Sequence, residues 1–176
     1  PAPSSDAAML AALLQYEGDL RRQSGVPELL YHVANETRRI VAYDQMFIAR
    51  QAQINDGFHI VCVSSLATVD RNAPLIQATE KLIAELAKGA GLDEACDFSA
   101  HALSNDPALA EYPYDAWRWQ PLFGHDGKIF AGLLVMREMP LREGEAFRLT
   151  RVAETVAHGW RALTGLGRDR TGQTEV

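Results

Sequence analysis

Residues 120–134 carry the sequence QPLFGHDGKIFAGLL. Two apolar stretches flank the turn residues Gly124–Gly127, and glycine and aspartate tolerate the positive φ that a tight hairpin requires. We therefore predict two antiparallel strands, over 116–123 and 128–138. Gly132 lies inside the second strand, where a glycine indicates the close approach of another backbone. The apolar run around it is typical of a central strand that is buried on both faces.

Helical periodicity surrounds this hairpin. Apolar residues recur at helical spacing in four segments, 6–24, 27–42, 75–86 and 147–163. Asp70 or Asn72 is expected to cap the third helix, and Gly89 and Gly91 are expected to end it. We therefore predict two helices before the first strand, one in the middle of the chain and one at its end.

A second hairpin is predicted nearer the N-terminus. The turn signal Asn55-Asp56-Gly57 separates two β-like stretches, Gln45–Gln53 and Phe58–Ser65. The region from 92 to 114 is irregular, and we expect only a short strand there, before Ala102. The resulting order is two helices, a hairpin, a helix, an irregular middle, a hairpin and a closing helix.

Short motifs agree with this order. Gln120-Pro121-Leu122, Asp126-Gly127-Lys128 and Ala131–Leu134 form one group, and Val26–Leu30 forms another. They resemble the second hairpin and the start of the second helix of GAF domains, and the resemblance covers 26–163. It implies an α+β fold with a central antiparallel sheet of about five to six strands flanked by helices, with the terminal helices packed together.

The resemblance also suggests how the chain is organised. We expect a disordered leader over 1–5, a single GAF-like domain over 6–164, and a disordered tail or linker over 165–176, where the apolar content is low. The segment 35–39 is similar to GAF-like regions that precede a membrane helix and a HlyD-type adaptor in bacterial efflux proteins. On that resemblance, the chain is the cytosolic part of a longer membrane protein.

Aromatic residues concentrate before and within the predicted strand 116–123. Their flat faces either line a ligand pocket or fill the core. Strand alternation puts the two tryptophans on one face and Arg118 and Gln120 on the other, where burial would leave polar groups that need a partner such as an anionic ligand. The predicted ligand-binding residues are Tyr112, Tyr114, Trp117, Arg118, Trp119 and Gln120.

The two cysteines do not indicate a catalytic or metal site. Cys62 lies in an apolar run and is expected in the core, whereas Cys96 has acidic neighbours that raise the pKa of a thiol. The segment 95–97 resembles one motif of GAF-like free methionine sulfoxide reductases, but their second cysteine segment is missing. The bilin-attaching cysteine and the cyclic-nucleotide residues of GAF relatives are not matched either, so no cofactor is implied.

Charge and hydropathy limit the choice of partners. The formal net charge is −6 over 176 residues, and no run of basic residues interleaved with aromatics offers a site for nucleic acid. No apolar stretch approaches the roughly 18 residues that span a bilayer, and no secretory signal begins the sequence. We expect a cytoplasmic domain that does not itself insert into a membrane.

These observations favour a non-catalytic sensory domain that binds an unidentified small molecule and signals through its terminal helices. The alternative is a ligand-free dimerisation scaffold, and a minor alternative is a GAF-type thiol redox enzyme. The first helix carries Met9, Leu10, Leu13 and Leu14, and any apolar surface left exposed there predicts a parallel homodimer through the terminal helices.

Overall fold

The sheet of the described chain consists of two hairpins and one further strand, which lies at an edge. The computed structural model describes residues 5–53 and 57–172, so Asn55 and Asp56 of the first predicted turn lie outside the described residues. The strands are β1 (Gln45–Gln51), β2 (Phe58–Val63), β3 (Cys96–Ser99), β4 (Ala116–Phe123) and β5 (Ile129–Arg137). Their order is β2-β1-β5-β4-β3, and every neighbouring pair is antiparallel. Both predicted hairpin pairs are confirmed.

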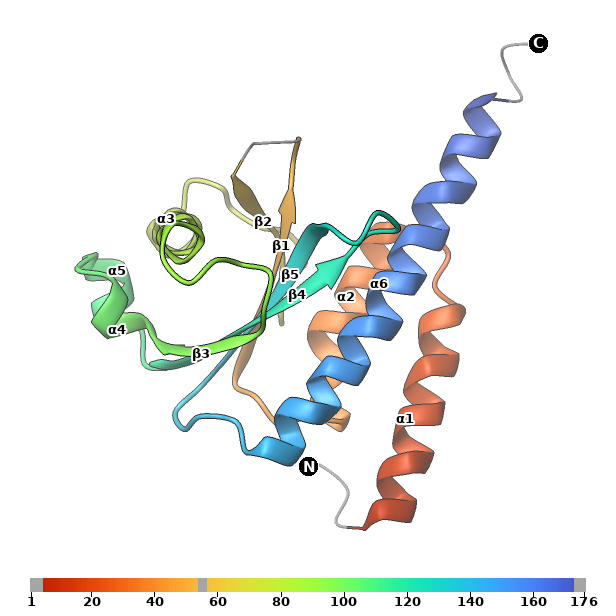
Figure 1. Cartoon of the computed structure of the whole chain (residues 1–176), viewed down its shortest axis with the longest axis horizontal. Coiled ribbons are helices and arrows are strands. Elements are labelled where there is room, and N and C mark those ends of the chain that lie inside the picture. Colours follow the sequence, from red (N-terminus) through yellow and green to blue (C-terminus); the bar gives the residue numbers. More distant parts are fainter. Residues whose placement is uncertain (1–4, 54–56, 173–176) are drawn as a thin grey trace.

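Helices cover both faces of this sheet. They are α1 (Asp6–Arg21), α2 (Val26–Glu36), the short 3-10 helix η1 (Thr37–Arg39), α3 (Pro74–Lys88), α4 (Ala100–Leu103), α5 (Pro107–Ala110) and α6 (Glu143–Gly172). Figure 1 shows α1, α2 and α6 on one side and α3, α4 and α5 on the other. The predicted α+β fold, a central antiparallel sheet flanked by helices, is confirmed.

The central strand β5 contributes to a separate core on each face of the sheet. Leu133 and Val135 pack in the core on the side of α2 and α6, whereas Leu134 and Met136 pack in the core on the side of α3. All four side chains are at most 1% exposed, because a central strand has helices on both faces. The continuous apolar run in the sequence predicted this burial.

The terminal helices pack together, as predicted. Thr155 of α6 donates a hydrogen bond to Glu17 of α1 across 3.4 Å. On α1, the buried Tyr16 hydroxyl lies 2.7 Å from the Thr37 hydroxyl after α2. Trp160 of α6 packs edge-on against Phe130 of β5 at 5.1 Å between ring centroids. These contacts join both ends of the chain to the same face of the sheet.

Two predicted helix boundaries were wrong. The second helix ends at Glu36 and not at residue 42, and the Thr37 hydroxyl donates to the Val33 carbonyl as η1 begins. The N-cap of α3 is Ala73, which has no capping side chain. The predicted cap Asp70 instead accepts a hydrogen bond from the Asn72 N–H and so closes the turn before the helix.

The disordered tail that was predicted to begin at residue 165 stays a prediction. The helix α6 continues to Gly172, past the position at which the disordered tail was expected to begin, and residues 173–176 lie outside the described part of the chain. In Figure 1 its last turns project beyond the sheet and the other helices.

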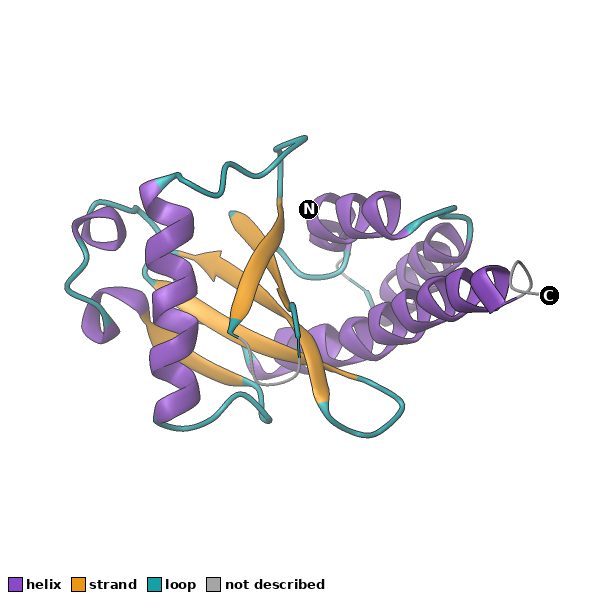
Figure 2. Cartoon of the chain, turned by 90° about the horizontal axis from the view of Figure 1, so that it is seen from above, coloured by secondary structure: helices purple, strands orange, loops and turns teal. Residues whose placement is uncertain are grey.

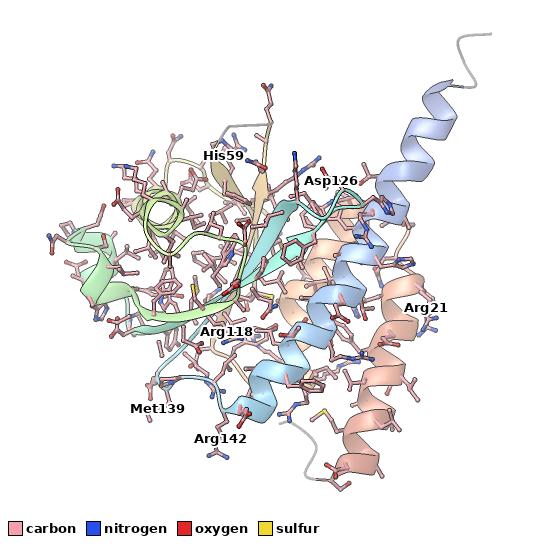
Figure 3. The ribbon with its side chains drawn as sticks, viewed as in Figure 1. Arg21, His59, Arg118, Asp126, Met139 and Arg142 are labelled. Carbon is pink, nitrogen blue, oxygen red and sulfur yellow. The ribbon has the colours of Figure 1, made fainter. Side chains whose placement is uncertain are left out.

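Arg137 fixes the connection from β5 to α6. Its two Nη atoms donate to the Glu145 carboxylate at 2.7 and 2.8 Å, and its remaining donors bind the carbonyl oxygens of Ala42, Met139 and Pro140. Figure 3 shows Met139 and Arg142 pointing outward along this connection. The bidentate pair holds the first turn of α6 at the end of β5.

Candidate ligand site

The aromatic residues of the predicted site fill the space between the sheet and α3. Trp117 and Trp119 are 1% and 0% exposed. The Trp117 indole N–H donates to the Tyr114 carbonyl at 2.7 Å, and the Trp119 indole N–H donates to the Leu92 carbonyl at 2.9 Å. Tyr112 packs edge-on against both Tyr114 and Trp117. Both indole donors are therefore satisfied within the core.

Trp119 also explains the glycine inside β5. A Cβ atom at Gly132 would lie 2.2 Å from Cη2 of the Trp119 indole, far inside van der Waals contact. The expectation of a close backbone approach was therefore wrong, because a side chain covers this glycine. The Trp119 indole can lie against β5 at this position because Gly132 has no side chain.

Arg118 and Gln120 lie on the opposite face of the sheet, as strand alternation predicts. The Arg118 Nη1 donates to Asp97 of β3 at 3.0 Å. In the described part of the chain, the buried Arg118 Nε and Gln120 Oε1 have no hydrogen-bond partner. Gln120 is only 4% exposed, on a strand that packs against α6. Figure 3 labels Arg118 on β4.

A cleft of about 760 Å³ opens at the C-terminal end of α3, within the range typical of small-molecule sites. In Figure 2 the end of α3, the loop after it and the β4–β5 turn lie along the same edge of the molecule. The lining residues are Gln51, Gly57, Phe58, Ile83, Ala84, Ala87, Gly91, Leu92, Asp93, Phe123, Gly127, Lys128 and Ile129.

Two residues that line this cleft contact Trp119, which is one of the predicted site residues. Phe58 packs edge-on against Trp119 at 5.5 Å between centroids, and Leu92 accepts the Trp119 indole hydrogen bond. The sequence analysis missed the cleft because its lining comes from separate segments with no common motif. Gly57 and Gly91, each followed by an apolar residue, and the turn glycine Gly127 were the only signal of it in the sequence.

The cysteines are too far apart to act together. Cys62 on β2 and Cys96 on β3 belong to the two opposite edge strands, which places them roughly 19 Å apart at the usual strand spacing. Burial raises the pKa of the Cys62 thiol to about 11, and burial followed by the Asp97 charge raises the pKa of Cys96. Neither thiol is activated. Among the described residues no cluster of histidine, cysteine or acidic side chains could hold a metal.

Comparison with solved structures identifies the fold. No family model matches the chain, and no curated protein matches it. The GAF domain of a phosphoenolpyruvate-protein phosphotransferase from Acinetobacter superposes with a TM-score of 0.68 and 14% identity, over 93% of this chain and 99% of that one. The chain has the GAF fold.

Two further structures with this fold have different activities. A free methionine-R-sulfoxide reductase from Neisseria meningitidis, solved with its substrate, has a TM-score of 0.65 and 17% identity, covering 94% of this chain and 97% of that one. A segment of a methyl-accepting chemotaxis protein has a TM-score of 0.63 and 13% identity, covering 86% and 98%. The GAF fold therefore does not by itself decide between sensing and catalysis.

The link to a HlyD-type adaptor stays a prediction. Within the described residues of this GAF-fold chain, no helix combines the length and apolar character that crossing a bilayer requires.

Proposed function

We propose that this chain is a non-catalytic sensory domain of the cytosol, which binds a small molecule in the α3 cleft and signals through its terminal helices. The observation that carries the proposal is the contact of the cleft walls with Trp119. Phe58 and Leu92 both line the cleft and both bind the indole. The chemotaxis protein of the same fold supports a sensory role, and the substrate complex of the reductase supports small-molecule binding.

Strand β4 offers a route from the cleft to α6. Trp119 faces the cleft side of the sheet, and its neighbours Arg118 and Gln120 face the other side. Each of these two neighbours has one buried polar atom without a partner in the described chain, and such atoms cost about 1–3 kcal/mol. In this proposal a second packing of α6 hydrates these atoms, and a ligand shifts the balance between the two packings.

In this proposal the six predicted residues have different roles. Trp119 contacts the cleft walls, Arg118 and Gln120 transmit the change to α6, and the cluster of Tyr112, Tyr114 and Trp117 supports β4 under the short helices. None of them acts as an acid, a base or a nucleophile. The isolated thiols support the absence of catalysis.

Native mass spectrometry of the purified domain, before and after denaturation, tests ligand binding. The variant Ala87→Trp fills the cleft from an exposed position on α3, and Ala110→Trp adds the same side chain at an exposed position on α5, outside the cleft lining. We expect a small molecule to be released from the wild type and from Ala110→Trp, but not from Ala87→Trp. Equal release from both variants would place the ligand elsewhere, and a bare wild-type chain would contradict the proposal.

A ligand-free dimerisation scaffold is the second candidate function. The filled space around Trp117 and Trp119 favours it, as does an apolar stripe on α1. Leu10 and Leu14 are each 59% exposed, and Ala7 and Ala11 continue the stripe at helical spacing. We propose that a second copy covers this stripe in a parallel dimer. Sedimentation equilibrium should give a dimer for the wild type and a monomer for Leu10→Glu, and a monomeric wild type at high concentration would refute it.

A further inference from the structure

Glycine backbone is exposed on several walls of the α3 cleft. Gly57, Gly91 and Gly127 all line it, and a Cβ atom at any of the three would meet no other atom within 4 Å. Gly91 and Gly127 have φ values of 86° and 76°, a conformation that disfavours residues with a side chain. Peptide groups without side chains let a flat ligand approach the backbone closely.

Two phenyl rings add flat apolar surface to the same cleft. Phe58 is held edge-on against Trp119, and Phe123 is 39% exposed although it is a large apolar side chain. A ring-shaped apolar ligand that packs on these surfaces removes its own apolar area and theirs from water. The body of the preferred ligand is therefore a flat ring system.

The cleft also carries one charge of each sign. Asp93 follows α3, and Lys128 stands in the β4–β5 turn, so the two charges come from separate segments. Both residues are exposed, and within residues 5–53 and 57–172 neither side chain forms an ion pair or a hydrogen bond. Asp126, which lies near Lys128, is already engaged because its Oδ1 accepts a hydrogen bond from the Lys128 backbone N–H at 3.0 Å.

Resting on the sensory function proposed above, we infer that the α3 cleft takes a flat zwitterion: an apolar ring system with a cationic group held by Asp93 and an anionic group held by Lys128. The formal net charge of −6 on the whole chain disfavours a ligand with several negative charges. A ligand with balanced charges avoids this repulsion and pairs with both side chains.

Four indole compounds test the inference, because they share one ring system and differ in charge. Tryptophan carries both charges, tryptamine carries only the positive one, 3-indolepropionate carries only the negative one, and 3-methylindole carries none. Dissociation constants come from an NMR titration of the 15N-labelled chain that follows the amides of Gly91 and Gly127. We expect tryptophan to bind about threefold or more tightly than either singly charged probe, as for partly exposed charge pairs, and 3-methylindole to bind most weakly.

Charge-removing variants assign each group. Asp93→Asn should lower the affinity for tryptophan to that for 3-indolepropionate, and Lys128→Met should lower it to that for tryptamine. Glu94→Gln is the matched control, since Glu94 is the exposed neighbour of Asp93 and stands outside the cleft lining. It should leave the affinity for tryptophan unchanged.

The outcomes separate this inference from the proposed function. Equal affinity for all four probes, or the same loss in Glu94→Gln as in Asp93→Asn, overturns the zwitterion assignment. If Ala87→Trp then abolishes the binding of the uncharged probe, the cleft still binds small molecules and the sensory proposal stands. Absence of binding by all four probes also overturns the assignment. If, in addition, native mass spectrometry finds no compound on the purified chain, the sensory proposal is refuted as well.

Discussion

Replacing Gly132 by alanine should destabilise the domain more than the same replacement at any other glycine whose surroundings the structure describes. The new Cβ atom would lie 2.2, 2.4 and 2.6 Å from three atoms of the Trp119 indole, so the ring must move by more than about 1 Å to reach normal contact. Neighbouring groups restrict such a movement of Trp119. It is fully buried, it packs against Phe58, and its N–H binds the Leu92 carbonyl at 2.9 Å.

The magnitude follows from two contributions. Overpacking of a filled core costs about 1–3 kcal/mol, and a strained or broken indole hydrogen bond adds about 1 kcal/mol. We therefore expect Gly132→Ala to lower the free energy of unfolding by about 2–4 kcal/mol, measured by urea denaturation with circular dichroism as the probe. The indole N–H resonance of Trp119 should shift in the same variant.

Two further variants make the reasoning refutable. Gly159→Ala on α6 is the control, because its Cβ would meet the Leu29 methyl groups at 3.9 and 4.0 Å and alanine favours a helix by about 1 kcal/mol over glycine. It should leave stability unchanged or raise it. Trp119→Phe should relieve part of the Gly132→Ala penalty, so the double variant should be less destabilised than the sum of the two singles. A Gly132→Ala penalty below about 0.5 kcal/mol, or full additivity with Trp119→Phe, would show that the indole does not limit space at the glycine.

Three other outcomes follow from the contacts described above. Gln120→Leu should raise the free energy of unfolding by about 1 kcal/mol, because it replaces a buried polar group that lacks a partner for Oε1, and it should slow amide exchange in α6; a less stable variant would contradict this. The hydrogen bonds from Arg137 lower the pKa of Glu145 below its usual value. The stabilisation that this ion pair provides is therefore full above about pH 4.3, and it is lost as the pH falls through the lowered pKa of Glu145. The midpoint of urea denaturation should therefore fall less steeply between pH 5 and pH 3 in Glu145→Gln, and identical slopes would exclude the pair as the cause. In the same urea assay, Tyr16→Phe should lower the free energy of unfolding by about 1 kcal/mol. The control Tyr31→Phe, at a 53% exposed site, should lower it by less than about 0.5 kcal/mol. Equal effects would mean that the hydroxyl contact of Tyr16 with Thr37 contributes nothing to stability.

Local patterns in the sequence were enough to predict most of the fold. Alternation and turn residues located β4 and β5, and the apolar run around Leu133 indicated a strand buried on both faces. The same alternation separated Trp119 from Gln120. These inferences succeeded because backbone geometry repeats every two residues in a strand and every 3.6 in a helix, so a short stretch of sequence records which side chains share a face.

Capping and termination were harder to predict from local patterns. Asp70 has the side chain of a helix cap, but it closes a turn earlier in the chain, and Ala73 begins α3 without a cap. The contacts of Thr37 with Tyr16 and Val33 accompany the end of α2. Distant packing decides between such alternatives when local preferences differ by only about 1 kcal/mol.

The candidate site depended on tertiary structure most of all. The sequence placed the tryptophans on one face but left open whether they fill the core or line a pocket, and it contained no sign that an indole covers Gly132. The cleft brings Phe58, Leu92 and Lys128 together from three separate segments. Periodicity within a segment determines which way a side chain faces. A cavity, in contrast, depends on how completely distant segments fill the space between them, so its volume cannot be predicted from the sequence of any single segment.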